Sequence, residues 1–340
     1  MRVLVTGGCG FIGQELVEQL ASRYGAYQVV VLDDRTPAAT GWQRVRDMGV
    51  PIWRGKVQDA ELVNNLFETE IPDVVIHCAA QSHVDASLNE PNLTWMANAI
   101  GTQVIAEACA RTHTPLVYCS TDEVYGSTPL DSNGVPVAVS EDAPLDPSSP
   151  YSASKAAGEH AVRAMGYSAG LEYAITRGNN CFGPNQLGEK LVPIACSLLL
   201  SGSAVPLHGG GQQLRQWVHV SEFADALHRT ASALFVGRIT GLTLNIAGPR
   251  LCSVRDLVMA LAAQIAVPPE EATWDSQDRP GQDSVYYCSG AAMQAALGGW
   301  VASRDILDPA ELQLLLDHYE DNKGEALIAN YVERLARSQK

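Results

Sequence analysis

The sequence predicts an α/β protein built on a doubly wound parallel sheet, with a smaller second α/β lobe. In the first half of the chain, apolar strand-like runs alternate with amphipathic helical patterns. The strand-like runs are apolar throughout, which is typical of a parallel sheet whose two faces are both covered by helices. Right-handed crossovers between such strands place helices on both faces of the sheet.

The expected elements follow one another in strand–helix order up to residue 178. Leu16, Val17 and Leu20, for example, recur at helical spacing after the first strand-like run. The expected strands lie at residues 2–7, 27–34, 73–80, 115–123 and 172–178, and the expected helices at 11–24, 61–70, 94–112 and 151–169.

The rhythm changes after about residue 180, where Gly- and Pro-rich loops separate short strands and helices. We therefore expect a first domain at 1–180, to which segments around 218–250 return, and a second lobe mainly at 181–325. Residues 127–150 are rich in Pro, Ser and Asp and predict a long loop over the sheet edge. Residues 326–340 are expected to form a helical tail, which docks on its own body or, alternatively, on a second copy.

The composition excludes several classes of partner. The formal net charge is −15, so neither nucleic acid nor an anionic membrane surface is expected to bind. The longest apolar stretch, 191–200, is too short to span a bilayer, and no signal peptide precedes the first strand-like run. The eight cysteines form no CxxC pair or Cys/His cluster, so we expect no metal site and a reducing cytoplasmic setting.

A glycine-rich turn predicts the cofactor site. Gly7, Gly10 and Gly13 lie between the first expected strand and helix, where a turn without Cβ atoms lets backbone N–H groups approach a pyrophosphate. The second expected strand ends in Asp33, whose carboxylate would accept the ribose hydroxyls of a dinucleotide and repel a 2′-phosphate. The pattern therefore favours NAD over NADP.

Two further motifs predict acid–base chemistry. Tyr151 and Lys155 lie at i and i+4 on one helix face, where an ammonium beside a phenol favours the phenolate. The fourth expected strand ends in Thr121, Asp122 and Glu123. An isolated Asp-Glu pair is usually a solvated turn, but here it follows Thr121 and precedes the Tyr–Lys pair. We interpret all five as catalytic.

These residues resemble the extended short-chain dehydrogenase/reductase family and, within it, the nucleotide-sugar 4,6-dehydratases of the dTDP-glucose type. The most specific segment is "TDEVYG", because related 4-epimerases lack the acid pair and decarboxylases typically carry "TSEVYG". The resemblance extends to about residue 320 and rests also on "AAQSHVDAS", "SPYSASKA", "RGNNCFGPNQLGEKLVP", "GGGQQLRQWVHV" and "DRPGQD". It implies a Rossmann first domain that binds NAD, a second lobe that binds a nucleotide sugar, and a homodimer formed through helices around 94–111 and 152–169.

The resemblance also implies the reaction. Tyr151 takes the C4 hydroxyl proton of the hexose while a hydride moves to NAD. Glu123 removes the C5 proton, Asp122 protonates the departing C6 hydroxyl, and the hydride returns to C6. Asp122 must be protonated while Glu123 is charged, so their environments should separate their pKa values. By the same resemblance the cofactor contacts include Phe11, Ile12, Ala79, Ala80 and Asn98, beside Tyr151 and Lys155.

The substrate residues implied by the resemblance are Ser82, Asn180, Lys190, Leu191, His208, Arg215, Asn245, Arg279 and Tyr286. Three of these are cationic, which suits a diphosphate in an acidic protein. The sequence departs from the family pattern at Lys56, Gln81, Ala86, His208, Gln282, Ser284 and Val285. Because these changes lie mainly on the substrate side, we expect a competent enzyme with an altered nucleotide or sugar preference.

Two other functions stay open on the sequence. A 4-epimerase or a decarboxylase would use the same scaffold and the same cofactor. A non-catalytic dinucleotide-binding sensor or scaffold would show no turnover, and Tyr151→Phe would then lose no activity.

Overall fold

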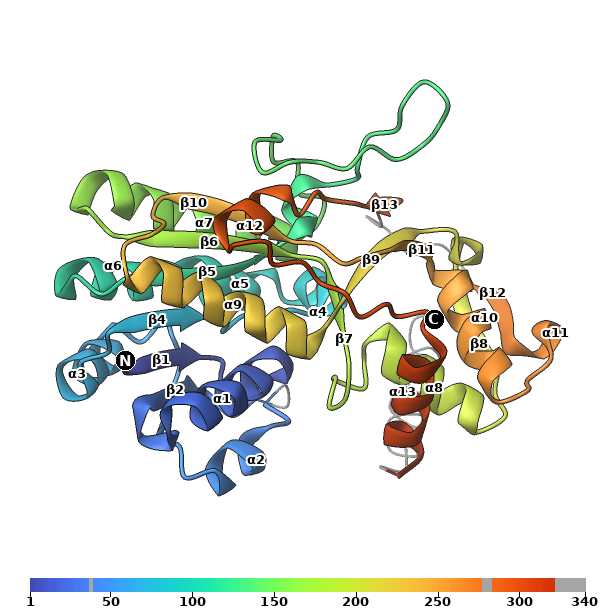
Figure 1. The fold of residues 1–340 in the computed structure, drawn as a ribbon, viewed down its shortest axis with the longest axis horizontal. Coiled ribbons are helices and arrows are strands. Elements are labelled where there is room, and N and C mark those ends of the chain that lie inside the picture. The colour runs from blue at the N-terminus through green and yellow to red at the C-terminus, as the bar shows by residue number, and fades with distance from the viewer. Residues whose placement is uncertain (37–38, 277–282, 322–340) are drawn as a thin grey trace.

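The computed structural model describes residues 1–36, 39–276 and 283–321. The main sheet has seven strands in the order β10-β6-β5-β4-β1-β2-β3 (Figure 1), and each of its pairings is parallel. The strands are β1 (Val3–Thr6), β2 (Val29–Asp33), β3 (Ile52–Arg54), β4 (Val74–His77), β5 (Leu116–Thr121), β6 (Tyr173–Gly178) and β10 (Leu242–Ile246). This confirms the predicted doubly wound parallel sheet.

Helices cover both faces of this sheet, because its strands bury alternate side chains on opposite sides. Val3 and Val5 of β1 pack in one core with residues of α1 and α9, whereas Leu4 packs in another core with residues of α3, α6 and α7. The helices that flank the sheet are α1 (Phe11–Tyr24), α3 (Ala60–Glu70), α6 (Gly101–Thr112), α7 (Pro150–Ala169) and α9 (Val220–Phe235).

Side-chain caps explain where several helices begin. The Ser149 side chain accepts from the Ser152 backbone N–H, and Ser152 returns the bond, which makes a capping box at the start of α7. Asp59 caps α3 in the same N-terminal position. Ser253 forms a second capping box at the start of α10 (Val254–Gln264).

The structure divides one expected helix into three pieces. The segment expected as a helix at 94–112 runs through α5 (Pro91–Trp95), a π-helical turn η2 (Met96–Ile100) and α6. The sequence also did not predict β3 and α2 (Trp42–Asp47), because a three-residue edge strand and a six-residue helix are too short to show a hydrophobic period. The remaining short elements here are η1 (Ala26–Gln28), η3 (Asp122–Tyr125) and α4 (Val84–Asn89).

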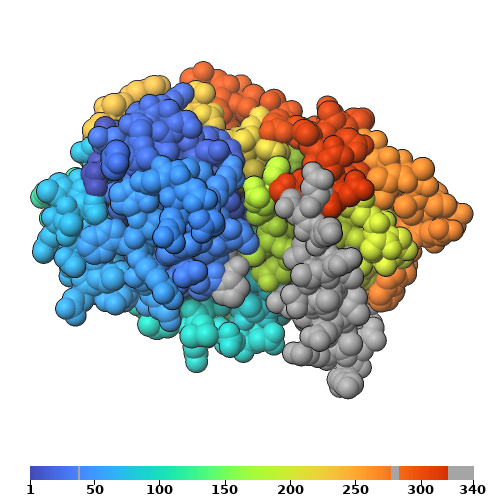
Figure 2. Space-filling model, turned by 90° about the horizontal axis from the view of Figure 1, so that it is seen from below, coloured from blue at the N-terminus to red at the C-terminus, as the bar shows by residue number. Residues whose placement is uncertain are grey.

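The second lobe has its own sheets and its own apolar core. One sheet holds β7 (Asn180–Phe182), β9 (Leu214–His219), β11 (Leu251–Ser253) and β13 (Val285–Tyr286), and a two-stranded sheet holds β8 (Val205–His208) and β12 (Thr273–Ser276). The helices and the 3-10 turn of this lobe are α8 (Leu191–Leu200), η4 (Gly209–Gly211), α10, α11 (Pro269–Ala272) and α13 (Pro309–Asp321). Figure 2 shows the N-terminal residues in blue and the orange segment of this lobe at opposite ends of the molecule.

Several segments cross between the two parts. α9 and β10 return to the main sheet, and α12 (Ala291–Ala296) contributes Met293 to the same core. The segment before α7 projects as a long loop (Figure 1), and its Val139 pairs with Cys288 of the second lobe. The division at residues 180 and 325 stays a prediction, and the helical tail expected at 326–340 lies outside the described residues.

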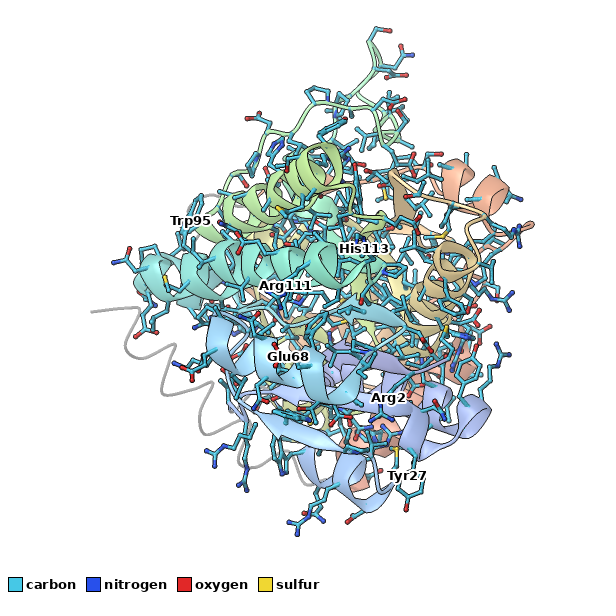
Figure 3. All side chains as sticks on the ribbon, turned by 90° about the vertical axis from the view of Figure 1, so that its left-hand side faces the viewer. Arg2, Tyr27, Glu68, Trp95, Arg111 and His113 are labelled. Carbon is cyan, nitrogen blue, oxygen red and sulfur yellow. The ribbon has the colours of Figure 1, made fainter. Side chains whose placement is uncertain are left out.

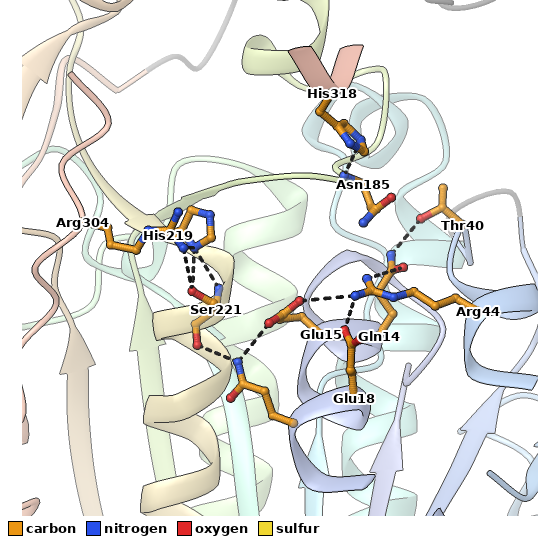
Figure 4. Close-up of polar contacts among 11 residues, drawn as sticks. Gln14, Glu15, Glu18, Thr40, Arg44, Asn185, His219, Ser221, Arg304 and His318 are labelled. Carbon is orange, nitrogen blue, oxygen red and sulfur yellow. Dashed lines mark hydrogen bonds and ion pairs between the residues drawn. The ribbon is translucent and has the colours of Figure 1, made fainter. Parts of the chain in front are cut away.

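Polar contacts hold the second lobe against the first (Figure 4). Arg304 Nη1 lies 2.8 Å from Nδ1 of His219, the N-cap residue of α9, and donates to Ser221 Oγ at 3.2 Å. The Ser221 carbonyl accepts from Gln19 Nε2 of α1 at 2.9 Å. These bonds connect the segment before α13 to the start of α9 and, through α9, to α1. Among the described residues, no helix is both long and apolar enough to cross a membrane.

Candidate active site

The turn between β1 and α1 is built for close approach of a phosphate. Gly7 has a φ of +69°, and a Cβ at Gly13 would lie 2.0 Å from the Gly7 carbonyl oxygen, so neither position accepts a side chain without strain. Gly10 is the N-cap of α1 and supplies no side-chain cap, and Phe11 and Ile12 form the first turn of the helix. The first backbone N–H groups of α1 are therefore available to an anion.

Asp33 lies at the end of β2 and binds the glycine turn directly. Its Oδ2 accepts from the Cys9 backbone N–H at 3.0 Å, and its Oδ1 accepts from the Arg35 N–H at 3.0 Å. Burial raises the pKa of this carboxyl above its ordinary value. A carboxylate has about four acceptor sites, so Asp33 can hold the turn and still accept from ribose hydroxyls.

The segment after β4 forms the other wall of this site. A Cβ at Gly7 would lie 2.7 Å from backbone atoms of Ala79 and 3.0 Å from the Cys78 carbonyl carbon, so this segment, which continues into Ala80, passes close to the turn. Asn98 in η2 is fully buried and binds the backbone of Gln81, the residue after Ala80. Asn98 Oδ1 accepts from the Gln81 N–H at 2.8 Å, and Asn98 Nδ2 donates to the Gln81 carbonyl at 3.0 Å. An open helix N-terminus, a backbone cradle and a buried acidic acceptor together fit a dinucleotide such as NAD.

The acid pair lies directly after β5. Thr121 Oγ1 accepts from the Glu123 backbone N–H at 3.3 Å, which turns the chain into η3. Asp122 is only 3% exposed, and burial raises its pKa to about 6. The Glu123 side chain is half-buried. Burial therefore moves Asp122 toward the protonated form that a general acid needs, in the direction predicted for the pair.

Tyr151 and Lys155 approach the same strand end from α7. Lys155 Nζ donates to the Cys119 carbonyl at 2.6 Å and lies 4.3 Å from the centre of the Tyr118 ring. The pKa of Tyr151 is raised by burial first and then by the Glu123 charge, while a hydrogen bond with Thr121 lowers it. The net shift of the Tyr151 pKa is therefore upward, opposite to the lowering predicted from Lys155, because burial is its largest cause.

Arg215 on β9 is the cation that faces the acid pair. It is buried, its Nη2 donates to the Asp283 carbonyl at 2.7 Å, and its guanidinium lies 4.1 Å from the centre of the Tyr286 ring. Its positive charge lowers the pKa of Asp122. Tyr286 Oη donates to Asp283 Oδ2 at 2.7 Å, so Arg215, Tyr286 and Asp283 form one rigid group on the second-lobe side.

Other predicted substrate residues are more scattered. Lys190 Nζ donates to the Ser82 carbonyl at 2.9 Å and so bridges the segment after β4 and the second lobe. Leu191 begins α8, Asn180 begins β7, and His208 ends β8, with its Nδ1 3.0 Å from Ser276 Oγ. Arg279 and Gln282 lie outside the described residues, so of the three predicted cations the structure places only Lys190 and Arg215.

Asn245 lies behind the site. Its side chain is fully buried, its Oδ1 accepts from Tyr125 Oη at 2.7 Å, and its Nδ2 donates to the Ser289 carbonyl at 3.1 Å. Because Tyr125 belongs to η3, Asn245 supports the segment that carries the acid pair.

Sequence reasoning missed Asn179, whose Nδ2 donates to Asp122 Oδ2 at 2.7 Å. The only sequence signal was its place beside Asn180 in "RGNNC". Across the described residues, no group of three His, Cys, Asp or Glu side chains is arranged to hold a metal ion.

A doubly wound sheet with a glycine turn, a Tyr–Lys pair and an acid pair at its carboxyl edge defines a dinucleotide-dependent enzyme of the short-chain dehydrogenase/reductase type. The chain belongs to the NAD dependent epimerase/dehydratase family, whose model matches residues 3–247. This confirms the predicted family, Rossmann fold and NAD cofactor.

Relatives agree with this assignment. The chain is 36% identical to a dTDP-glucose 4,6-dehydratase of Streptomyces antibioticus, with 95% of this chain and 94% of that protein covered. It is 33% identical to a dTDP-glucose 4,6-dehydratase of Mycobacterium tuberculosis H37Rv, covering 98% and 99%.

Solved structures show the same fold. The dTDP-glucose 4,6-dehydratase DesIV of Streptomyces venezuelae, solved with NAD and dTDP bound, matches with a TM-score of 0.85 and 33% identity over 96% of this chain and 100% of that one. A UDP-glucose 4-epimerase of Thermus thermophilus, solved with NAD, matches with a TM-score of 0.80 and 32% identity over 94% and 99%.

Proposed function

We propose that this chain is a nucleotide-sugar 4,6-dehydratase, a hydro-lyase that converts a dTDP-glucose-like NDP-hexose into the NDP-4-keto-6-deoxyhexose. The observation that carries the proposal is the acid pair Asp122–Glu123 at the end of β5, beside Tyr151 of α7. The dehydratase names of the relatives support it.

NAD, when bound, supplies a hydride acceptor for C4 of the sugar and a hydride donor for C6 at the end of the cycle. Tyr151 Oη takes the proton of the C4 hydroxyl, and the hydroxyl of Thr121 hydrogen-bonds to that phenol. The resulting C4 ketone makes the C5 hydrogen acidic, because the C5 carbanion is stabilised as an enolate.

The acid pair then removes water across C5 and C6. The Glu123 carboxylate accepts the C5 proton, and the Asp122 carboxyl gives its proton to the C6 hydroxyl, which leaves as water. Positioned acid and base groups typically accelerate such steps by about 10²–10⁴-fold each. Burial of Asp122 at the strand end supports its role as the acid, since burial favours the neutral carboxyl.

The second lobe would hold the nucleotide diphosphate. Arg215 and Tyr286 present a cation and a ring on the side of the acid pair, and Lys190 reaches from the second lobe to the segment after β4. At a position where the family pattern has arginine, Ser284 instead pairs its hydroxyl with Ser127 at 2.7 Å. This neutral contact supports a substrate preference that differs from the usual one, with fewer cations on the diphosphate.

The product of a nucleotide-sugar panel tests the proposal. With dTDP-glucose and its uridine counterpart, we expect a product lighter by one water, with solvent deuterium at C5. Deuterium placed at C4 of the substrate should appear at C6. Return of that label to C4 would indicate a 4-epimerase, and full activity in Tyr151→Phe would exclude the proposed chemistry.

We further propose a cytoplasmic homodimer. The cysteines of the structure are all free, which suits a reducing compartment. Along α5 and η2 four apolar side chains are exposed by 42–58%, namely Leu93, Trp95, Met96 and Ile100. Figure 3 shows Trp95 on the side of the molecule where α6 and α7 lie next to each other, which is the helical face expected to form the dimer.

Light scattering tests this interface. Met96→Glu with Ile100→Glu should convert a dimer into a monomer, because two charges would be buried without partners. Leu130→Glu, at a comparably exposed apolar residue in the projecting loop, should leave the dimer intact. A monomeric wild-type protein would reject the dimer.

A further inference from the structure

Asn179 connects the proposed acid to the second lobe. It lies between β6 and β7 and is 4% exposed. Its Nδ2 donates to Asp122 Oδ2 at 2.7 Å, and its Oδ1 accepts from the Gly248 backbone N–H at 3.0 Å. Nδ2 also lies 3.3 Å from Cys288 Sγ.

These partners determine which way the amide of Asn179 points. A backbone N–H can only donate, so the atom that faces Gly248 must be the amide oxygen. The NH₂ group must then face Asp122. The orientation of this amide therefore follows from its hydrogen bonds, and Asp122 Oδ2 always meets a donor.

We propose that Asn179 is a positioning residue that keeps the acid proton of Asp122 on Oδ1. The Asn179 NH₂ lies 2.7 Å from Oδ2 and needs an acceptor there, and the carbonyl oxygen of a protonated carboxyl accepts better than its hydroxyl oxygen does. The amide therefore favours the proton on Oδ1. Thr121 Oγ1 donates to Oδ1 at 3.4 Å, but a hydroxyl can rotate and accept from a protonated Oδ1, whereas an amide NH₂ can only donate. The same carboxyl oxygen then delivers the proton in every turnover. This inference rests on the proposed function, in which Asp122 protonates the leaving C6 hydroxyl.

The groups around Asp122 set its pKa, so the effect of Asn179 on the acid can be measured through pH dependence. Asp122 is faced by the Arg215 cation of β9 and the Cys288 thiol of the second lobe, and Glu123 follows it in η3. Burial raises the pKa of Asp122, whereas the Asn179 donor and the Arg215 charge lower it. Loss of the Asn179 donor should therefore raise the pKa of Asp122 further.

Asn179→Asp is the sharpest test. The new carboxyl keeps an acceptor for Gly248 and nearly the same volume, but it replaces the amide donor with a second carboxyl. Two carboxyls at this distance share one proton, which is then held between them and away from the substrate. We expect product formation to fall at least tenfold, while the absorbance of reduced cofactor accumulates after substrate is added.

Asn179→Ala provides a second readout. It removes the donor without adding a charge, so the alkaline limb of the pH–rate profile for elimination should move upward by about 1 pH unit. A residue that only supports the fold would lower activity at every pH without moving this limb.

Gln216→Leu is the matched control. Gln216 binds the same two segments, because its Nε2 donates to the Gly248 carbonyl at 3.0 Å and its Oε1 accepts from the Cys288 N–H at 2.9 Å. It has no contact with Asp122 among the hydrogen bonds of the described residues. We expect neither accumulation of reduced cofactor nor a shifted alkaline limb in this variant.

The outcomes separate this inference from the proposed function. Normal turnover in Asn179→Asp, or an equal shift of the alkaline limb in Asn179→Ala and Gln216→Leu, would overturn the role of Asn179. A wild-type protein that forms no 4-keto-6-deoxy product would instead reject the proposed function. Thermal melting of each variant establishes that it is folded before its rates are compared.

Discussion

The Glu159 carboxylate and the Arg177 guanidinium form a buried two-point ion pair between α7 and β6. Arg177 Nη2 lies 2.7 Å from Glu159 Oε2, and its Nε lies 3.0 Å from Oε1. Ser120 Oγ donates to the same Oε1 at 2.7 Å. Because Ser120 directly precedes Thr121, this pair ties the helix of Tyr151 and Lys155 to the strand end that carries the acid pair.

Removal of one partner of this pair should be costly. Glu159→Ala leaves the Arg177 guanidinium buried without its carboxylate, so we expect a loss of about 3–5 kcal/mol in the free energy of unfolding. Urea unfolding monitored by circular dichroism measures it. The double variant Glu159→Leu/Arg177→Met should recover part of the loss, because an apolar pair needs no compensation. A loss below about 1 kcal/mol in the single variant would contradict this account.

Glu123→Gln should separate the two halves of the reaction. The amide cannot accept the C5 proton, but Tyr151 still allows C4 to be oxidised. Product formation should fall by about 10²–10⁴-fold, and reduced cofactor should accumulate within the first turnover, seen by its absorbance. Glu107→Gln, at an exposed carboxylate of α6, serves as the control and should behave as wild type. Absence of accumulation in Glu123→Gln would remove Glu123 from the role of base.

Asp122→Asn should stabilise the protein at neutral and alkaline pH. Burial raises the pKa of Asp122 from the ordinary 3.8 to about 6. Below pH 3.8 the folded and unfolded chains both keep the proton, and above it the unfolded chain loses the proton more readily. Stability is therefore lost as pH rises toward 6, by at most about 3 kcal/mol.

The asparagine carries no such penalty. Its advantage in the free energy of unfolding should be about a third of its full value at pH 4.5 and reach that full value at pH 8, measured by urea unfolding at both values. An advantage of equal size at both values of pH would show that ionisation of Asp122 is not its cause. The same variant should slow loss of the C6 hydroxyl.

Asp33→Asn should weaken NAD binding about 10- to 100-fold, because hydrogen bonds to a charged acceptor contribute about 1.5–3 kcal/mol. The neutral side chain also holds the Cys9 and Arg35 N–H groups less well. Titration of the cofactor by calorimetry gives the affinity. Asp34→Asn, at the neighbouring residue, should bind NAD as wild type does, and unchanged affinity in Asp33→Asn would reject the ribose assignment.

Part of the fold could be read from local patterns. The strands β1, β2, β4, β5 and β6 and the helices α1, α3 and α7 follow continuous apolar runs and amphipathic periods that lie within each segment. β3 and α2 could not be predicted, because their few residues carry no period and β3 is placed at the edge of the sheet only by its pairing with β2. The π-helical turn η2 was hidden for a related reason, since a helical pattern does not reveal a change in hydrogen-bond register.

By itself the sequence determined the family, the cofactor turn and the order of the catalytic motifs, because each motif consists of residues close together along the chain. Only the tertiary structure decided what surrounds them. Asn179 is 57 residues from Asp122 in the chain, yet β5 and β6 are neighbours in the sheet and bring the two side chains into contact. Asp122 is buried and meets the Asn179 amide because segments distant in the chain pack together, and a local sequence pattern cannot predict such packing.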